Sequence, residues 1–350
     1  MAAIGVICKK KKRTWFTLSE IRFLNMNELL QKALFSCLVL TACVSAFAVD
    51  PEVNLIPWPQ SLVMGTGEMS LTESSRIVYS DSSLSSLADV VAREIEEVTR
   101  LQLTKIQGNN PSTGDIYLKL TTDPTITGEA YKVTVDTSAT AEAANYNAVA
   151  MASVTVIQAI KETGGSYSVP KMTVEDAPDA EYRGLLVDVA RQYHSIDTLK
   201  EAVEMCRLYK VRYLQLHLTD DQSFTFPSTA YPDLTNYSFH YSLSEMQDLV
   251  AYADARGVII IPELEVPGHA GVFTNVMPGL FGTDGRNVIN FASPAVWTAV
   301  ETLIDEICDV FQSTPYFHLG SDEAWIWGLE SHGDFPAAIS TYGVGDIEGM

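Results

Sequence analysis

The chain has few cysteines, few basic residues and no glycine-rich phosphate loop, and each absence excludes a class of protein. Only 5 of its 350 residues are cysteine, and beyond Cys43 only Cys206 and Cys308 remain. This excludes a disulfide framework and a zinc site built from cysteine pairs. The 23 lysines and arginines face 44 acidic residues, for a net charge of −21. Such a chain repels phosphate backbones, so we expect no nucleic-acid partner.

Two further features bound the class of protein. No Gly-x-Gly-x-x-Gly or Walker sequence follows any predicted strand, which argues against nucleotide binding. Hydrophobic residues make up 47% of the chain, which is enough for a full core and argues against intrinsic disorder. The sequence carries no indication of an oligomeric state.

Residues 1–48 differ from the rest in charge and predict a signal peptide. They hold seven basic and two acidic residues, whereas residues 49–350 hold 16 basic and 42 acidic residues. The uncharged, mostly apolar run over 33–42 is too short to span a bilayer and is typical of the hydrophobic part of a signal peptide. Ala46-Phe47-Ala48 then supplies the small residues of a cleavage site.

A second interpretation of this segment stays open. Leu40-Thr41-Ala42-Cys43 resembles the bacterial lipobox, in which the cysteine becomes lipid-modified. Cleavage after Ala48 gives a soluble exported protein, whereas the lipobox gives a lipid anchor at Cys43. We therefore expect an exported protein that is periplasmic, extracellular or lipid-anchored at the cell envelope. No other stretch of the sequence predicts a transmembrane helix.

Residues 50–178 predict a small α+β domain. Strand patterns cover 76–79, 115–120 and 131–135, and helical periodicity covers 87–98 and 146–160. Gly164-Gly165 and Ala177-Pro178-Asp179 mark the end of this domain.

Residues 180–350 predict an α/β domain of alternating strands and helices. Apolar strands begin near 184, 213, 258 and 316, the first of them expected to be covered on both faces. Ser195 and the Ser242–Glu245 capping box open the intervening helices. Every strand ends in polar residues, as in a (β/α)8 barrel, whose active site lies at those ends. A doubly wound open sheet would also place ligands there.

The length of this second domain predicts only part of a barrel. Residues 184–350 supply about four βα units, whereas such a barrel has eight and spans about 250 residues. We therefore expect the N-terminal half of a barrel, as a fragment or a truncated gene product. A half-barrel should expose its strand edges.

Asp322-Glu323, in the sequence His318-Leu-Gly-Ser-Asp-Glu, is the clearest candidate for chemistry. Two adjacent carboxylates follow an apolar strand and a glycine that lets the backbone turn. Like charges close together do not ionise equally, so one carboxyl can stay protonated as a general acid while the other stays charged. For an acidic pair without other site residues around it, the simpler interpretation is a solvated helix N-terminus, where acidic residues are common.

Three more motifs accompany this pair: Tyr182-Arg183-Gly184-x3-Asp188, His217-Leu-Thr-Asp220-Asp221-Gln222, and Pro262-Glu-Leu-Glu-Val-Pro-Gly-His269-Ala270. Together they resemble glycoside hydrolase family 20, the β-N-acetylhexosaminidases, from about Asn54 to the end of the chain. Ser321 stands where that family usually has a second glycine, and Gln215 where it often has tryptophan.

The resemblance implies a small α/β domain before a (β/α)8 barrel, and a retaining exo-glycosidase without a cofactor or metal. Its substrates would be amino-sugar glycosides such as chitooligosaccharides and glycan termini, with either GlcNAc or GalNAc at the end. In this family the substrate's own 2-acetamido oxygen attacks the anomeric carbon. Glu323 would protonate the leaving oxygen, and Asp322 would orient the acetamide.

The resemblance also implies a set of substrate-binding residues. Arg183 would donate paired hydrogen bonds to sugar hydroxyls, and Asp220 and His269 would set the protonation of Glu323. Arg183 could instead pair with Asp188. His217 is assigned to the site as well, although a packed histidine inside the barrel is an equal alternative. A metal site at His217, Asp220 and Asp221 fits no standard ligand spacing, so we expect none.

Two other functions remain open at this point. The missing half of the barrel favours a catalytically inactive, truncated relative that binds sugar. A deeper pocket would favour a relative that releases a disaccharide, such as a lacto-N-biosidase.

Overall fold

A computed structural model describes residues 53–283 and 285–349. The predicted signal peptide at residues 1–48, including the alternative lipid site at Cys43, lies outside these residues. Within the described part of the chain, no helix combines the length and the apolar character needed to cross a membrane.

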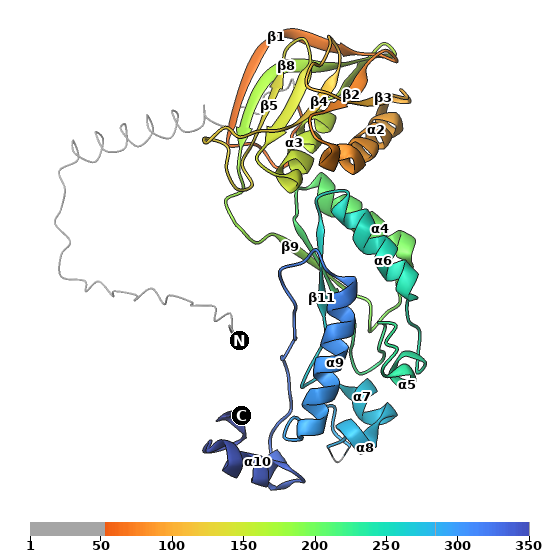
Figure 1. Cartoon of the computed structure of the whole chain (residues 1–350), viewed down its shortest axis with the longest axis vertical. Helices are drawn as coiled ribbons and strands as arrows, with labels where there is room; N and C mark the ends of the chain where they lie inside the picture. The colour runs from red at the N-terminus through yellow and green to blue at the C-terminus, as the bar shows by residue number, and fades with distance from the viewer. Residues whose placement is uncertain (1–52, 284, 350) are drawn as a thin grey trace, which may run out of the picture. The chain divides into compact units, whose positions relative to one another are not determined.

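Residues 61–176 form an eight-stranded mixed sheet with two helices packed on one face (Figure 1). The strand order is β1-β8-β5-β6-β4-β2-β3, and β7 pairs with β8. The strands are β1 (Ser61–Leu71), β2 (Arg76–Tyr79), β3 (Thr104–Gln107), β4 (Ile116–Leu120), β5 (Tyr131–Val135), β6 (Ala139–Ala143), β7 (Lys161–Thr163) and β8 (Ser166–Asp176). The helices are α2 (Ser85–Thr99) and α3 (Tyr146–Gln158), whose buried faces share a core with the sheet.

The elements predicted for this domain are confirmed, but the sheet is larger than predicted. β2, β4, β5, α2 and α3 fall where the sequence pattern placed them. The pattern missed β6, because its inward residues are alanines with little strand preference, although they alternate buried and half-buried. It also missed β1 and β8, which pair over most of their length, and β1 is exposed at most of its positions.

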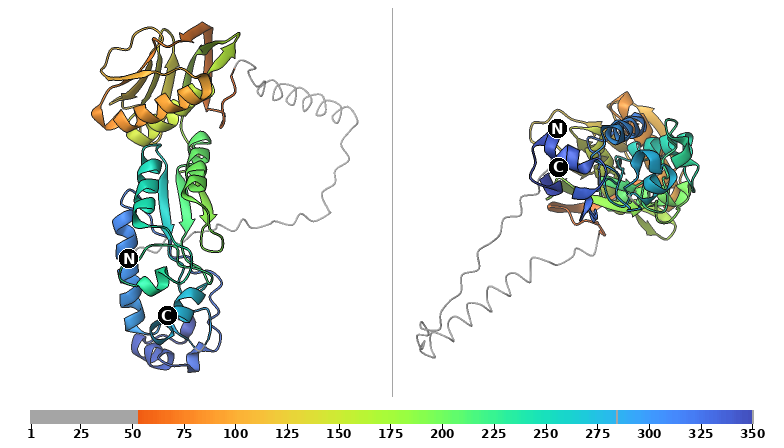
Figure 2. Two further views of the ribbon diagram at one scale, coloured as in Figure 1. Left: turned by 90° about the vertical axis from the view of Figure 1, so that its right-hand side faces the viewer. Right: turned by 90° about the horizontal axis from the view of Figure 1, so that it is seen from below.

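A second sheet begins at residue 184 and consists of three parallel strands in the order β11-β10-β9. Helices follow each strand, as in the first units of a (β/α)8 barrel. The elements are β9 (Gly184–Asp188), α4 (Ile196–Leu208), β10 (Tyr213–His217), α5 (Pro232–Thr235), α6 (Leu243–Asp254), β11 (Ile259–Glu263), α7 (Gly271–Val276), α8 (Pro278–Phe281), α9 (Pro294–Val310) and α10 (Phe335–Tyr342). Two further views in Figure 2 show these helices beside the strands.

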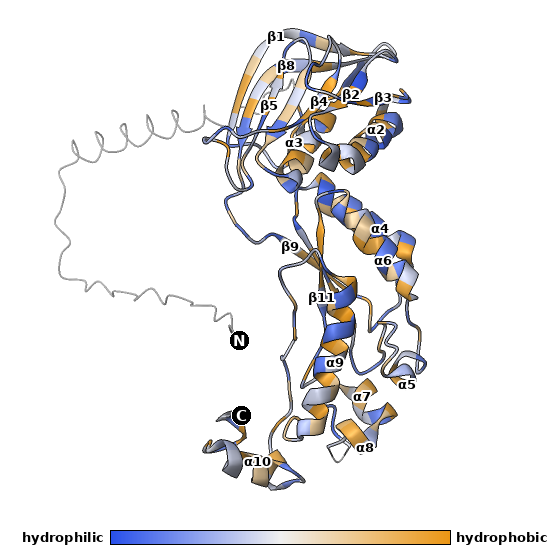
Figure 3. Cartoon of the chain, viewed as in Figure 1, coloured by the Kyte–Doolittle hydropathy of each residue, from blue (hydrophilic) through white to orange (hydrophobic). Residues whose placement is uncertain are grey.

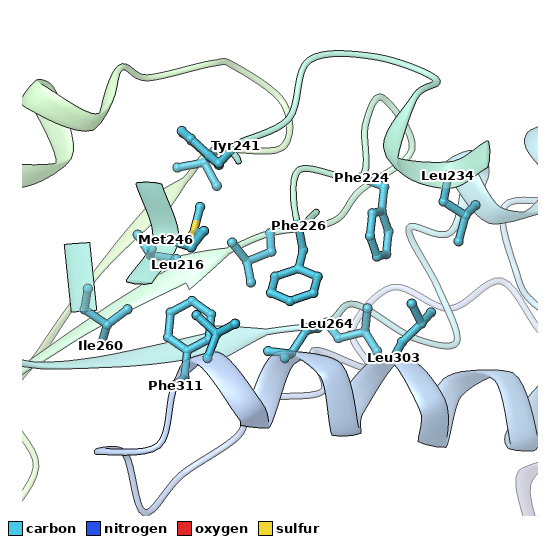
Figure 4. Packing of buried hydrophobic residues seen from close by; sticks show 14 of the residues in the cluster. Leu216, Phe224, Phe226, Leu234, Tyr241, Met246, Ile260, Leu264, Leu303 and Phe311 are labelled. Carbon is cyan, nitrogen blue, oxygen red and sulfur yellow. The ribbon is translucent and has the colours of Figure 1, made fainter. Parts of the chain in front are cut away.

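The core of this domain lies between the sheet and its helices. Figure 4 shows Leu216 of β10 and Leu264 after β11 packed toward Leu303 and Phe311 at the α9 side. In Figure 3 the strands are largely hydrophobic, whereas the helices carry one polar and one apolar side. Ser195 and Ser242 cap α4 and α6 as predicted, and the Ser242–Glu245 capping box is present.

Two predictions about the strands need correction. The segment near 316 is not a full strand: only His318 bridges to Glu263, although its backbone runs parallel to β11. β9 was expected to be covered on both faces, yet Leu185 is 39% and Leu186 52% exposed. The reason is that β9 is the edge of the three-stranded sheet.

A buried arginine joins the two sheets' helices. Arg207 on α4 donates to both carboxylate oxygens of Glu94 on α2, and to Ser153 and Ala150 on α3. It also donates to the carbonyl oxygen of Arg256 after α6. Because its side chain is only 1% exposed, this one residue satisfies polar groups on α2, on α3 and just after α6 from a buried position.

Candidate active site

The parallel register brings polar residues into one row at the carboxyl ends of the strands. Asp188 ends β9, His217 ends β10 and Glu263 ends β11, and the three are direct partners across the sheet. The bridge from Glu263 to His318 continues the row to a fourth segment. In barrels of this type the active site forms at this face.

Arg191 enters the site through a turn that Asp188 builds. Asp188 Oδ1 accepts hydrogen bonds from the backbone N–H groups of Ala190 and Arg191 at 3.0 and 2.9 Å. Arg191 Nη1 then donates to Asp188 Oδ2 at 2.8 Å, and its Nη2 lies 2.7 Å from Asp220 Oδ2. Burial alone would raise the pKa of Asp188, but the bonds from Arg191 outweigh it and hold that pKa below its usual range.

His217 lies between two carboxylates. Its Nε2 is 2.8 Å from Asp220 Oδ2, and its Nδ1 is 3.2 Å from Glu263 Oε1. Burial disfavours the charged imidazolium, but the hydrogen bonds to Asp220 and Glu263 outweigh it and raise the pKa of His217 to about 10. His217 is therefore a buried cation at neutral pH.

His269 connects this buried network to the acidic pair. Its Nδ1 lies 3.8 Å from Asp220 Oδ1, and its Nε2 lies 3.3 Å from Glu323 Oε2 and 4.0 Å from Asp322 Oδ2. A Cβ on Gly268 would meet the backbone of Asp322 and Ala324 at 2.9 Å. Glycine at 268 thus permits the close approach that brings His269 to the carboxylates.

Asp322 and Glu323 are exposed at the surface of the site. Their side chains are 72% and 78% exposed. Ser321 and Glu323 both have positive φ, at 76° and 49°, a conformation that L-residues seldom adopt. Two bonds from Ser321 hold this turn: its N–H donates to Glu265 Oε1 and its hydroxyl to the carbonyl of Val266, each at 2.8 Å.

A cavity of about 450 Å³ opens beside Glu323. Asp221 lies on its wall and accepts hydrogen bonds from Gly271 N–H at 2.8 Å and from Asn287 Nδ2 at 2.7 Å. Trp325 also lines it and is 71% exposed. The cavity combines carboxylates, an amide and an aromatic face, which suits a polar ligand with an apolar side.

The structure does not bring Arg183 to this site, so its predicted position is wrong. Arg183 precedes Gly184 at the amino end of β9, roughly 16 Å along the strand from Asp188. There it donates to the carbonyls of Ala180 and Lys210, and its Nη1 lies 2.7 Å from Glu129. The alternative pairing with Asp188 is excluded for the same reason, since Asp188 pairs with Arg191.

The other five predicted residues do come together. Glu323, Asp322, His269, Asp220 and His217 form one chain of contacts. Their roles toward a substrate stay predictions.

The structure adds four residues to this set: Arg191, Gln215, Glu263 and Glu265. Glu263 ends a strand, and Arg191 and Glu265 follow strands, which was the available signal. For Gln215 the only signal was that it stands where the family often has tryptophan. In the structure its Nε2 donates to Glu263 Oε2 at 2.7 Å.

Three groups of described residues are close enough to hold a metal ion: His217, Glu263 and Glu265; Asp220, Asp221 and His269; and His269, Asp322 and Glu323. The first group is a poor ligand set. Both ring nitrogens of His217 are occupied by carboxylates, and a protonated imidazole has no lone pair for a metal.

Both parts of the chain match models of one family of glycoside-cleaving enzymes. Residues 181–348 match the catalytic domain of glycosyl hydrolase family 20, and residues 52–177 match domain 2 of that family. The chain therefore belongs to glycosyl hydrolase family 20.

Two curated relatives of this chain are named β-hexosaminidases. The chain is 28% identical over 305 residues to a β-hexosaminidase of Vibrio furnissii, covering 77% of this chain and 49% of that protein. It is 26% identical to a β-hexosaminidase of Porphyromonas gingivalis, covering 78% and 39%. The chain thus spans about half the length of these curated relatives.

Solved structures show the same fold. An exo β-N-acetylglucosaminidase of Vibrio harveyi, in complex with N-acetylglucosamine, matches with a TM-score of 0.75 and 24% identity, covering 83% of this chain and 50% of that chain. A β-N-acetylhexosaminidase of Streptomyces coelicolor matches with a TM-score of 0.72 and 22% identity, covering 84% and 65%. These likenesses support the predicted fold, a partial (β/α)8 barrel after a small domain.

Proposed function

We propose that this chain carries the catalytic acid and the acetamide-binding group of an enzyme that removes terminal β-linked N-acetylhexosamine. The observation that carries the proposal is the contact of His269 with Glu323 on one side and Asp220 on the other, at the carboxyl ends of the strands. The family and the names of the relatives support the choice of an amino sugar. The complex of the Vibrio harveyi enzyme with N-acetylglucosamine supports it as well.

The proposed reaction divides the work between the two exposed carboxyls. Glu323, when protonated, donates to the glycosidic oxygen as it leaves, and afterwards accepts a proton from the attacking water. The substrate's 2-acetamido oxygen attacks the anomeric carbon from within the sugar, which gives retention. Asp322 accepts the acetamide N–H and stabilises the positive charge that develops there. His269 orients Glu323 from behind.

Arg191 is the proposed sugar-binding cation in place of Arg183. Its side chain is 47% exposed and can reach a ligand beyond its bonds to Asp188 and Asp220. A planar guanidinium can bind two neighbouring hydroxyls of a sugar with paired hydrogen bonds.

Hydrolysis of an aryl β-N-acetylglucosaminide by the protein of the complete reading frame tests this proposal. Glu323→Gln should lower kcat by about 10²–10⁴-fold, because a general acid contributes that much. Glu330→Gln, an exposed glutamate seven positions later, is the matched control and should keep the rate. An aryl β-glucoside, which lacks the acetamide, should not react. Full activity of Glu323→Gln would exclude the role of Glu323.

The same assay separates the proposal from a sugar-binding protein without catalysis. That alternative is favoured by the exposure of Trp325 and Trp327, at 71% and 66%, since exposed aromatic faces suit sugar rings. Quenching of tryptophan fluorescence by N-acetylglucosamine, without hydrolysis of any glycoside, would support it instead.

We also propose that the protein is exported, on the sequence of residues 1–48 alone. Mass spectrometry of the mature N-terminus tests this. A start after Ala48 supports a free exported protein, whereas a lipid-modified Cys43 supports an anchored one. An intact N-terminus would contradict both.

A further inference from the structure

A second carboxyl lies buried directly beneath the turn that carries the acidic pair. Glu265 follows β11 and its side chain is fully buried. Its Oε1 accepts the N–H of Ser321 at 2.8 Å, and its own N–H donates to Thr219 Oγ1 at 2.8 Å. Glu265 is therefore fixed at both ends, and it fixes the residue immediately before Asp322.

The turn is built around this carboxyl. Gly320 has a φ of 62°, and a Cβ at that position would overlap the Glu265 carboxyl group. The backbone of the turn thus rests on the carboxyl with no room for a side chain. A change in the position of Glu265 would move Gly320 and Ser321, and with them Asp322 and Glu323.

Glu263 is an acidic neighbour of Glu265, and the hydrogen-bond donors around the pair favour the negative charge on Glu263. His217 and Gln215 both donate to Glu263, which is 4% exposed. Glu265 receives only the Ser321 N–H, and its Oε2 is buried without a hydrogen-bond partner among the described residues. An oxygen of Glu263 lies within 4.8 Å of an oxygen of Glu265. Two bare carboxylates buried this close together repel, so one of the two holds a proton.

The surrounding charges assign the proton to Glu265. Burial raises the pKa of Glu265 most, the Ser321 N–H lowers it, and the neighbouring Glu263 and Asp322 raise it further. Burial raises the pKa of Glu263 too, but the bonds from His217 and Gln215 outweigh it and lower that pKa. The pair therefore holds one negative charge, on Glu263, opposite the His217 cation.

We propose that Glu265 is a positioning residue held as a neutral carboxylic acid, which shares its proton with Glu263 and fixes the turn that presents Asp322 and Glu323. The acid donates one hydrogen bond and accepts another, so it joins the buried strand-end network to the exposed pair. This inference adds a supporting residue to the proposed function, but its test needs no substrate.

Glu265→Gln is the informative variant, because an amide has the same shape as a neutral acid and can also donate to Glu263 and accept from Ser321. Glu306→Gln is the matched control. Glu306 accepts hydrogen bonds from Ser228, Thr229 and Ala230, which outweigh burial and hold its pKa below the usual range.

Infrared difference spectra of the full chain, with ¹³C-labelled glutamate, report the protonation directly. At neutral pH we expect the carbonyl band of a protonated carboxylic acid in the unchanged chain and in Glu306→Gln, and its loss in Glu265→Gln. Absence of the band from the unchanged chain would overturn the proposal. A stoichiometric divalent metal that a chelator removes with loss of stability would also overturn it, in favour of a metal between His217, Glu263 and Glu265.

Unfolding by urea between about pH 5 and 6.5 gives an independent measurement. This window lies above the unfolded pKa of glutamate, 4.5, and below that of histidine, 6.5. A glutamate whose folded pKa is raised contributes stability that is present below 4.5 and declines as the pH rises. As the pH rises through this window, the free energy of unfolding of the unchanged chain should therefore fall relative to that of Glu265→Gln, with a slope close to that of one released proton. The free energy of unfolding of Glu306→Gln should change with pH as that of the unchanged chain does. Parallel curves for Glu265→Gln and the unchanged chain would contradict the proposal.

Hydrogen exchange at the Ser321 amide tests the positioning itself. Glu265→Ala removes the acceptor, so the Ser321 N–H should exchange at least about tenfold faster, and Glu265→Gln should restore the protection. Equal exchange in all three proteins would show that Glu265 does not hold the turn. If Glu323→Gln stays fully active, the proposed function fails, and these three measurements still decide the role of Glu265.

Discussion

Replacing Arg207 by methionine removes the polar connection between α4 and the helices of the first domain while keeping an apolar side chain of similar length. In the structure Arg207 donates five hydrogen bonds: two to Glu94 and one each to Ser153, Ala150 and Arg256. After the change, Glu94 would keep its charge without the guanidinium.

The magnitude follows from burial. Removing one partner of a buried ion pair costs about 3–5 kcal/mol, because the other charge is left uncompensated. Arg207 is 1% exposed, but Glu94 is 17% exposed and can partly rehydrate. We therefore expect a loss near the lower limit, about 3 kcal/mol in the free energy of unfolding, or roughly 6–12 °C in Tm. A cycle with Glu94→Gln should give a coupling of about 2 kcal/mol between the two residues.

Urea unfolding at neutral pH, followed by circular dichroism, measures these quantities. Lys132→Met is the matched control, because its pair with Glu175 is 34% and 61% exposed and should contribute less than about 1 kcal/mol. A loss for Arg207→Met no larger than that of the control would refute the reasoning. It would mean that water replaces the guanidinium at little cost.

Three further predictions concern the candidate site. Arg191→Lys should raise the KM for an aryl β-N-acetylglucosaminide by about tenfold, or 1.4 kcal/mol, whereas Arg183→Lys should lower thermal stability without that rise; equal effects on KM would contradict the positions found for these arginines. Gly320→Ala should destabilise the chain by at least about 1–3 kcal/mol in urea, because of its positive φ and the overlap with Glu265; an unchanged midpoint would show that the turn relaxes freely. The folded pKa of His217, about 10, lies above its unfolded value of 6.5, so the stability it contributes is fully present below pH 6.5 and is lost as the pH rises through 10. The difference in unfolding free energy between the unchanged chain and His217→Gln should therefore shrink over that range, and a constant difference would refute the raised pKa.

Much of the site could be predicted because strand ends are visible in the sequence. An apolar run that ends in polar residues identifies the carboxyl end of a parallel strand, and such ends meet at one face of the sheet. This pattern places His217, Asp220 and His269 near Asp322 and Glu323 from the sequence alone. The three- and four-residue steps of α2 and the caps of α4 and α6 were visible for a similar reason, since they depend on neighbours in the sequence.

The fold was less predictable where pairing partners are distant. β1 and β8 pair through residues about 100 positions apart, and the largely exposed β1 has few buried positions to indicate a strand. The exposure of β9 depends on which strands lie beside it, which its own apolar sequence does not show.

The sequence by itself determined the order of elements, the strand ends and the acidic pair, because each depends on residues close together in the chain. Only the tertiary structure decided between Arg183 and Arg191. The two are eight residues apart and stand at opposite ends of one strand, and the register with β10 decides which of them faces Asp220. It also placed two donors, His217 and Gln215, on Glu263 and left Oε2 of the buried Glu265 without one among the described residues, which depends on neighbouring strands.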